Sequence, residues 1–350
     1  LPMTKIGNKP PTIKQLARQL DVSVSTVSRA LSNHPRIGLV TTQRVQQLAK
    51  ELGYEPNSQA IFFKQNRTFI IGVVLPDIQE AFFSQAITGI EAAATLHHYT
   101  MLFGQSYDDL EIEKRIVGVM RKQRVDGLII SLSKQTNTYN HLKAFEKYSI
   151  PIVYFDRVPT ITDVHKVYCD LYHVTIEMVT WFFNKGYKRI GLINGPGTLA
   201  ASSERLKGYI EGVGQRKLKV DMQLVETTDL SKKSTIEAMK KLLALKNPPQ
   251  VIISFNEYVH MDAVQFAKQL NIKVNTDVLF ASYANLPMTA YTSNPPVVSV
   301  EQYPYKQGEK AMEMMMRLLQ NKNDPGSTDN DYHIEILPAS LILQGIDVNA

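Results

Sequence analysis

The first 55 residues contain three short stretches in which apolar positions recur at helical spacing. Thr12 and Gln15 match a capping box at the start of the first stretch, which predicts a helix there. Ser23 can cap a second helix over Val24–Leu31, and a third helix is expected over about Thr42–Leu52. Two short helices joined by a tight turn, with a third after them, predict a helix-turn-helix unit.

From Thr68 the pattern changes to short apolar runs that alternate with longer stretches of helical periodicity. The run Phe69–Leu75 is rich in β-branched residues and Pro76 follows it, which predicts a buried strand. The alternation predicts an α/β body of parallel βαβ units, and two sheets suit its length better than one. Further strands are expected over Tyr99–Gln105, Gly127–Leu132, Pro151–Phe155, Arg189–Asn194, Gln250–Phe255 and Asp277–Ser282, with helices over 83–98 and 108–123.

Charge is distributed unevenly along the chain. The formal net charge of all 350 residues is +6, whereas residues 1–67 alone hold ten Lys and Arg against three Asp and Glu. A small basic head on a near-neutral remainder is typical of nucleic-acid binding, because cationic side chains neutralise phosphates. A solvated basic surface would carry the same charge, so the local helical pattern has to decide between the two interpretations.

The second predicted helix is small and polar at its N-terminal end, which suits a DNA major groove only about 12 Å wide. Its first turn can reach base edges, and Arg29 can bond a guanine edge in bidentate fashion. In an isolated helix its hydroxyl residues would be interpreted as polar surface with one cap. Within a basic three-helix unit they favour DNA recognition. They are Ser23, Ser25, Thr26 and Ser28.

Composition excludes several classes of protein. The single cysteine, Cys169, excludes a disulfide framework and a Cys-based zinc site, and it suits a reducing compartment. No apolar run approaches the ~18 residues of a membrane span. The first 20 residues lack the apolar stretch of a signal peptide. We therefore expect a soluble cytoplasmic protein.

Two stretches of the head resemble the lactose/galactose repressor (LacI/GalR) family of bacterial transcription regulators: TIKQLARQLDVSVSTVSRAL and RVQQLAKELGYEPN. The resemblance continues through IIGVVLPDIQEAFFSQAITGIEAAA, RVDGLIIS, IPIVYFDR, GYKRIGLINGPG, SERLKGY and LPASLILQG, and it covers about Pro11 to about Gly345. VSVSTVSRAL is highly specific, whereas the later motifs are weaker singly but occur in the order of the family.

The resemblance implies a periplasmic-binding-protein-like type 1 fold for the body, with two doubly wound parallel-sheet subdomains. The implied domains are a helix-turn-helix domain over 1–55, a hinge helix and linker over 56–67, and an effector-binding and dimerisation domain over 68–350. The first subdomain is expected to cover about 68–166 and 300–328, and the second about 167–299 and 329–350.

The resemblance also implies DNA contacts residue by residue. The hinge helix of the family reads N-x-x-A-x-x-L; Asn57 and Ala60 fit this pattern, and Phe63 takes the Leu place, where a phenylalanine can still wedge between base steps. Asp21 and Gly38 replace a usual Gly and a usual Ser. The base-reading positions match Val24, Ser25 and Arg29, and the backbone-binding positions match Thr12, Ser23, Thr26 and Asn57.

Ligands of open parallel sheets bind beyond the carboxyl ends of the strands, so residues that follow strands are pocket candidates. Carboxylate, guanidinium and amide groups beside aromatic rings suit a polyhydroxylated molecule, because hydroxyls need both donors and acceptors. In many relatives an Asp follows the late strand, but Ala284 takes its place here and Asn285 is the candidate substitute. The other positions that match the family's pocket are Phe82, Phe83, Asp156, Arg157, Arg205, Leu230 and Asn256.

Two other classes of protein share parts of this pattern. An enzyme finds little support, because the eight histidines show no HExxH spacing and Gly191–Gly197 lacks both GxGxxG spacing and a P-loop lysine. An exported sugar-binding protein would share the body but not the basic head.

The sequence therefore predicts a DNA-binding transcription regulator, a repressor by resemblance, without cofactor or metal and without catalytic residues. Its expected partners are a pseudo-palindromic double-stranded operator, a small carbohydrate effector and a second copy of the chain. Dimerisation is expected from helices near 83–98 and 306–320. The second of these carries an apolar stripe that suits a core and an interface equally. Its members are Met312, Met315, Met316 and Leu319.

Overall fold

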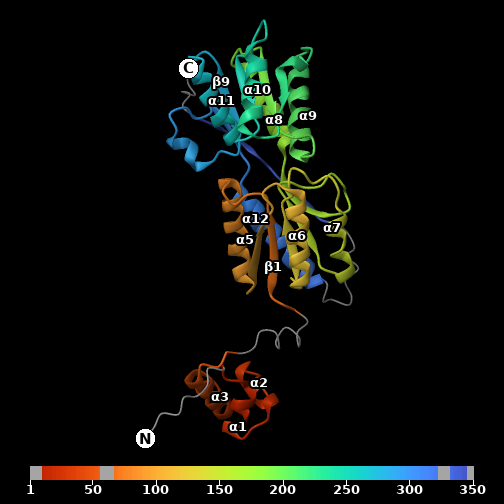
Figure 1. Ribbon diagram of the computed structural model, residues 1–350, viewed down its shortest axis with the longest axis vertical. Helices are drawn as coiled ribbons and strands as arrows, with labels where there is room; N and C mark the ends of the chain where they lie inside the picture. Colours follow the sequence, from red (N-terminus) through yellow and green to blue (C-terminus); the bar gives the residue numbers. More distant parts are fainter. Residues whose placement is uncertain (1–9, 56–66, 322–331, 345–350) are drawn as a thin grey trace. The chain divides into compact units, whose positions relative to one another are not determined.

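The computed structural model describes residues 10–55, 67–321 and 332–344 (Figure 1). The chain divides into two units, Leu1–Thr68 and Phe69–Ala350, which we call the head and the body. The three expected hinge-helix residues, Asn57, Ala60 and Phe63, lie outside the described residues.

The head is a helix-turn-helix unit of α1 (Ile13–Leu20), α2 (Val24–Leu31) and α3 (Leu39–Leu52). The expected capping box is present at α1, and Asp21 ends that helix in the left-handed region at φ 53°. Helix α3 begins three residues before the expected start. The apolar pattern missed this turn because Leu39 and Val40 are 80% and 72% exposed and do not contribute to the core.

The body contains two six-stranded sheets among its described residues. In the first the order is β11-β5-β4-β3-β1-β2, and every pair is parallel. In the second the order is β12-β10-β9-β8-β6-β7, and only β12 runs antiparallel to its neighbour. The strands are β1 (Ile70–Leu75), β2 (Thr100–Gln105), β3 (Gly127–Ile130), β4 (Ile152–Phe155), β5 (His165–Cys169), β6 (Ile190–Asn194), β7 (Val225–Thr227), β8 (Val251–Ser254), β9 (Leu279–Tyr283), β10 (Val298–Glu301), β11 (Ile334–Leu337) and β12 (Ser340–Leu343).

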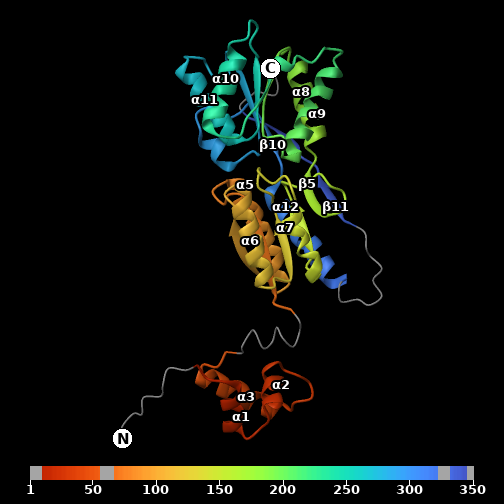
Figure 2. The same ribbon diagram turned by 45° about the vertical axis from the view of Figure 1, so that its right-hand side comes forward.

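Helices cover both faces of each sheet, as Figures 1 and 2 show. On the first sheet α5 and α12 lie on one face and α6 and α7 on the other, and on the second sheet α8 and α9 lie opposite α10 and α11. The helices are α5 (Ala81–Leu96), α6 (Leu110–Lys122), α7 (Asn140–Lys143), α8 (Leu171–Asn184), α9 (Ala200–Gly214), α10 (Lys232–Leu243), α11 (Glu257–Gln269) and α12 (Pro304–Asn321), with 3-10 turns at Glu146–Tyr148, Met222–Leu224 and Pro287–Tyr291. None of the helices in the described part of the chain is long and apolar enough to span a bilayer.

The helices α5 and α12 pack with their backbones almost in contact. A Cβ on Gly89 would lie 2.0 Å from the Tyr305 carbonyl oxygen, and one on Gly308 would lie 2.0 Å from the Ala86 carbonyl oxygen, so only glycine fits at either position. The methionine stripe of α12 belongs to the core, because all four of its members are at most 5% exposed. Dimerisation through these helices stays a prediction.

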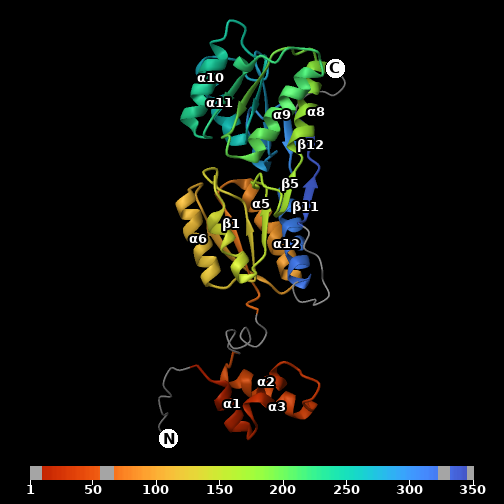
Figure 3. The ribbon, with the colours of Figure 1, turned by 90° about the vertical axis from the view of Figure 1, so that its right-hand side faces the viewer.

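The chain passes three times between the sheets, after β5, after β10 and between β11 and β12 (Figure 3). We call residues 69–169, 302–321 and 332–337 lobe 1, and residues 170–301 and 340–344 lobe 2. The expected subdomain limits were wrong at three strands: β11 and the end of β5 belong to the first sheet, where they pair with each other, and the end of β10 belongs to the second sheet. The strands β5 and β11 run directly into the other lobe, so no turn residue marks the change.

Candidate functional site

The recognition helix α2 presents the predicted base-reading side chains to solvent. Val24, Ser25 and Arg29 are exposed, whereas Val27 and Ala30 are buried in the core of the head. The exposed Thr12 caps α1. The Ser23 hydroxyl accepts from the Thr26 N–H at 3.0 Å and lies 2.8 Å from the hydroxyls of both Ser25 and Thr26. The helix therefore presents an ordered polar end with one cation beside it, and its contacts with DNA stay a prediction.

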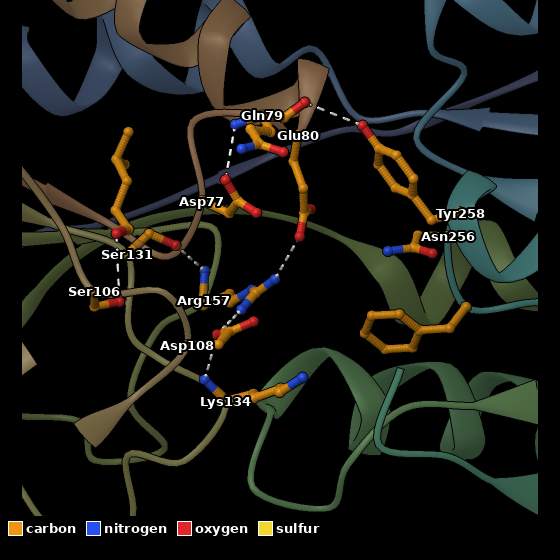
Figure 4. A network of polar contacts seen from close by, with 12 residues as sticks. Asp77, Gln79, Glu80, Ser106, Asp108, Ser131, Lys134, Arg157, Asn256 and Tyr258 are labelled. Atoms are coloured by element: carbon orange, nitrogen blue, oxygen red, sulfur yellow. Dashed lines mark hydrogen bonds and ion pairs between the residues drawn. The ribbon is translucent and has the colours of Figure 1, made fainter. Parts of the chain in front are cut away.

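In lobe 1 the Arg157 guanidinium joins the loops that follow three strands (Figure 4). Its Nη1 donates to Asp108 Oδ1 at 2.5 Å, and its Nη2 lies 3.5 Å from Glu80 Oε1. The backbone N–H of Arg157 donates to the Ser131 hydroxyl at 3.3 Å. Its Cζ lies 5.3 Å from the ring centroid of Phe83, which packs edge-on against Phe82. Both predicted phenylalanines thus support Arg157 from the core side.

In this network the positive charge of Arg157 is balanced by the nearby carboxylates. Burial alone would lower the pKa of Arg157, but the carboxylates of Asp108, Glu80 and Asp156 raise it above its ordinary value. Burial raises the pKa of Glu80, and Arg157 opposes that shift. Arg157 is 8% exposed, so its charge is stabilised by these partners and not by water.

The two lobes meet through hydrogen bonds on both sides of this network. The Tyr258 hydroxyl of lobe 2 donates to the Gln79 carbonyl oxygen of lobe 1 at 3.2 Å (Figure 4). The Lys134 ammonium donates to the Asp229 carbonyl oxygen at 3.0 Å, and the Thr198 hydroxyl donates to the Lys134 carbonyl oxygen at 2.5 Å. Because the Lys134 N–H also donates to Asp108 at 2.9 Å, the lobe contacts are tied to the Arg157 network.

In lobe 2 the Arg205 guanidinium lies between two aromatic rings. Its Cζ is 4.0 Å from the ring centroids of both Phe255 and Tyr283, and its Nη1 donates to the Phe255 carbonyl oxygen at 2.9 Å. Burial lowers the pKa of Arg205 to about 10, and Tyr283 and Asp156 only partly oppose that shift. No ion pair of Arg205 occurs among the described residues.

Several buried polar atoms near the carboxyl ends of β6 and β8 have no hydrogen-bond partner within the described parts of the chain. They are Arg205 Nε, Asn194 Oδ1, Ser202 Oγ and Ser254 Oγ. A buried polar group without a partner costs roughly 1–3 kcal/mol, so native structures rarely keep several together without a reason. An occupant that supplies hydrogen bonds is one such reason.

Asp156 follows β4 in the left-handed region, at φ 56°. Within the described ranges no hydrogen bond reaches its carboxylate, although protein atoms surround it. Burial raises the pKa of Asp156 to about 6, and Arg157 and Arg205 oppose that shift. The residue also lines a cavity of about 230 Å³ between the lobes. Its carboxylate is therefore a hydrogen-bond acceptor that faces open space.

The remaining predicted residues have other partners. Asn256 caps α11, where its Oδ1 accepts from the Val259 N–H at 2.9 Å. Leu230 adopts φ 67° and its N–H contacts the Thr228 hydroxyl. Asn285 bonds Glu301 and Gln344 near the lobe crossings. Only Asp156 among the predicted pocket residues lines the cavity.

Sequence reasoning missed most of the cavity lining, which comes from β5, from the first turns of α9 and from the crossing after β10. The only signal available was the position of Cys169 at the end of an apolar stretch. The unpredicted polar residues of the lining are Thr160, Lys166, Tyr168, Cys169, Ser203, Glu204, Lys207 and Gln302.

The charged residues of that lining already have partners. Lys166 is buried and donates to the Ile161 and Pro159 carbonyl oxygens at 3.1 and 3.4 Å. Lys207 pairs with Glu204 at 3.2 Å. Neither lysine pairs with Asp156, which leaves its carboxylate available to a ligand. No group of three or more His, Cys, Asp or Glu suited to a metal ion occurs in the described part of the chain.

Comparison with known proteins identifies the family of the chain. Residues 12–57 match the family of bacterial regulatory proteins called lacI, and residues 68–336 match the periplasmic binding proteins and sugar binding domain of the LacI family. The HTH-type transcriptional repressor CytR of Escherichia coli K12 is 28% identical over 312 residues, which are 89% of this chain and 91% of CytR. The repressor PurR of Photobacterium profundum is 26% identical, and the matched region covers 89% of this chain and 93% of PurR.

Among solved structures, the lac repressor dimer bound to operator and the anti-inducer ONPF has a TM-score of 0.81 at 21% identity, covering 95% of this chain and 98% of that one. This likeness confirms the predicted fold, a helix-turn-helix head on a body of two parallel-sheet subdomains. The chain belongs to the LacI family of bacterial regulatory proteins, whose members are DNA-binding transcription regulators with an effector-binding body and not enzymes.

Proposed function

We propose that this regulator is a cytoplasmic repressor that binds a near-palindromic operator as a homodimer and answers to a carbohydrate held between its lobes. One observation carries the effector half of the proposal: the unpartnered Asp156 carboxylate and the unpartnered Arg205 Nε lie on the two facing lobes. A carboxylate needs a donor and a guanidinium needs an acceptor. A hydroxyl group supplies both, so a polyhydroxylated molecule satisfies both sides.

The cavity volume limits the size of the effector. Pockets for drug-sized ligands span about 300–1,000 Å³. The cavity at Asp156 has about 230 Å³, so it suits a single sugar or a molecule of similar size. Relatives with an acid after the late strand would add another acceptor, which Ala284 cannot supply here.

For the DNA half, the proposed base contacts come from Val24, Ser25 and Arg29, with Thr12, Ser23 and Thr26 on the backbone. Two copies related by a two-fold axis would match a two-fold operator. Asn57, Ala60 and Phe63 complete the proposal for the hinge. Effector binding would change how the lobes close and thereby operator affinity, and such coupling is typically about 1–3 kcal/mol in both directions.

The DNA half is tested with duplexes selected by the purified chain from a random pool. We expect Arg29→Ala to lose the preference for the selected duplex over a scrambled one, because a base contact carries discrimination. The matched control is Lys50→Ala, which removes another exposed cation of the head outside α2 and should keep the parental preference for the selected duplex. Equal discrimination by the parent and by Arg29→Ala would overturn the assignment. Affinity should also fall steeply between about 50 and 200 mM salt.

The effector half is tested by thermal unfolding of the parent with D-ribose, D-glucose, cytidine and D-glucose 6-phosphate, each at millimolar concentration. A ligand of the native state raises the melting temperature by mass action. We expect at least one neutral compound to raise it. A melting temperature that none of the neutral compounds changes would contradict a carbohydrate effector.

A further inference from the structure

The segment Ala284–Thr289 follows β9 within lobe 2 and has an unusual backbone. Ala284 has φ 92° and Asn285 has φ 37°. Asparagine tolerates the left-handed region, whereas alanine there is strained by about 1 kcal/mol or more. A strained pair persists only where its surroundings fix it, so the contacts of the segment must hold this backbone in place.

On one side the segment is bonded to strands that cross between the lobes. Asn285 Nδ2 donates to Glu301 Oε2 at 2.8 Å, and Gln344 Nε2 donates to Asn285 Oδ1 at 3.1 Å. Glu301 ends β10 immediately before the crossing to α12, and Gln344 follows β12. The Ala284 N–H also donates to the Val300 carbonyl oxygen at 2.9 Å.

Glu301 extends this link into the crossings themselves. Its Oε1 accepts from the Tyr303 N–H at 2.7 Å, and the Tyr303 hydroxyl donates to the Ser340 hydroxyl at 3.0 Å. The next residue, Gln302, accepts at its carbonyl oxygen from Cys169 Sγ at 3.0 Å. All three crossings are therefore connected by hydrogen bonds that start at the Glu301 carboxylate or at the Gln302 carbonyl oxygen.

On the other side the segment is bonded to the N-terminal end of α11. Glu257 Oε2 accepts from the Leu286 N–H at 2.7 Å, and its Oε1 accepts from the Thr289 hydroxyl at 3.2 Å. Glu257 begins α11 next to Asn256, and the following residue, Tyr258, makes the hydrogen bond to lobe 1. The segment thus connects α11, and with it the Tyr258 contact to lobe 1, to the crossings through side chains that have defined partners.

From this placement we infer that Asn285 is a positioning residue for the lobe hinge: its amide links the loop beyond β9 to Glu301 and so fixes the angle at which the lobes face each other. This explains why the position after Ala284 carries an amide and not an acid. An amide donates to Glu301 and accepts from Gln344 at once. A carboxylate at 285 could still accept from Gln344 but would repel Glu301.

The inference deepens the proposed function, because effector-driven closure would act through this hinge, but its test needs neither effector nor DNA. Cys169 is buried, so spin labels can be attached at Arg115→Cys on α6 and Ala244→Cys at the end of α10, which are exposed and lie outside the helices expected to form the dimer. Pulsed electron paramagnetic resonance on the full chain, with labelled copies diluted into an excess of unlabelled copies, then reports the distance between the lobes of one copy.

We expect one narrow distance distribution for the parent and its loss, by a shift or a broadening, in Asn285→Asp. Adding Glu301→Gln should restore the narrow distribution, because a glutamine amide can donate to the new carboxylate. The matched control is Asn271→Asp, which changes another left-handed asparagine that is exposed. It should keep the parental distribution.

Asn285→Ala, which removes the link without adding charge, decides the matter if Asn285→Asp does not fold, and it should also lose the narrow distribution. A parental distribution in a folded Asn285→Asp, or no restoration by Glu301→Gln, would overturn the role of Asn285. Neither result would affect the DNA proposal, which has its own assay.

Discussion

The two lobes use the same residue type in opposite ways. In lobe 1 Arg157 has Asp108 and Glu80 as partners and an aromatic ring behind it. In lobe 2 Arg205 has two rings and one carbonyl oxygen, and its Nε has no partner among the described residues. The Arg157 guanidinium therefore pairs with carboxylates of the protein itself, whereas the Arg205 guanidinium keeps one N–H that can still donate a hydrogen bond.

This difference indicates that the charge of Arg157 stabilises the fold, whereas the charge of Arg205 is suited to binding a ligand. A saturated network can gain little from a ligand, whereas a desolvated group without a partner gains a full hydrogen bond when one arrives. In lobe 1 the Arg157 network therefore has little to gain from a ligand, whereas in lobe 2 Arg205 Nε is a group that the proposed effector would satisfy. Four substitutions can break or sharpen this comparison.

The largest effect is expected from Arg157→Met. It leaves Glu80 and Asp108 without their cation, and breaking a buried pair typically costs about 3–5 kcal/mol. Arg205→Met removes no ion pair but leaves the Phe255 carbonyl oxygen without its donor, so we expect a smaller loss of about 1–3 kcal/mol. Urea unfolding, followed by the fluorescence of the single tryptophan, Trp181, measures both. If both variants lost the same free energy of unfolding, the proposed difference between Arg157 and Arg205 would be wrong.

The next effect depends on pH. The folded pKa of Asp156 is about 6, against an ordinary 3.8, so the native state binds more protons than the unfolded state between these values. The free energy of unfolding therefore falls as pH rises from about 4 to 6, and the deficit remains above pH 6. Asp156→Asn cannot ionise, so it should be more stable than the parent at pH 8 by up to about 3 kcal/mol.

That advantage of Asp156→Asn should shrink toward pH 4, where the parental carboxyl is protonated too. Thermal or urea unfolding at both pH values measures it, with the exposed Asp163→Asn as the matched control. A constant difference between parent and variant across this range would show that Asp156 has a hydrogen-bonding donor after all.

A third effect concerns ligand response. With a sugar that stabilises the parent, present at about 100 times its dissociation constant, the gain is about 2.7 kcal/mol. Arg205→Met should lose most of this gain, because its guanidinium supplies the donors of lobe 2. Arg216→Met, at an exposed arginine on the same lobe, should keep it. An undiminished melting shift in Arg205→Met would remove Arg205 from the site.

The smallest effect is expected from Tyr258→Phe, which removes only the hydroxyl that donates to Gln79 across the lobes. One such hydrogen bond contributes about 0.5–1.5 kcal/mol. The urea midpoint should decrease slightly, while Tyr291→Phe, at a tyrosine that is 91% exposed, should leave it unchanged. A decrease as large as that of Arg157→Met would mean that the lobe contact, and not the Arg157 network, dominates stability.

Prediction from sequence succeeded where local chemistry is strong. The strand β1 lies within the apolar run Phe69–Leu75, and α2 has its expected bounds. It named no strand at β5, β7, β10, β11 or β12, and β5 and β11 run into the other lobe without a turn residue. For the site, it named Asp156 and Arg205 as effector contacts, which stays a prediction; the structure places Asp156 directly after β4 and buries Arg205. It could not tell Arg157 from Arg205, because the partners of each come from distant loops.

The sequence by itself determined the basic three-helix head, the α/β body and the family, because caps, periodicity and charge are local properties that a linear pattern records. Only the tertiary structure decided that the methionines of α12 are core, that Arg157 is saturated and that Asn285 is bonded to the crossing strands. These outcomes depend on atoms that are distant along the chain; Asn285, for example, is bonded to Glu301 across 16 residues and to Gln344 across 59. The residue type fixes how many hydrogen bonds a side chain can make, but the tertiary structure decides which partners are within reach.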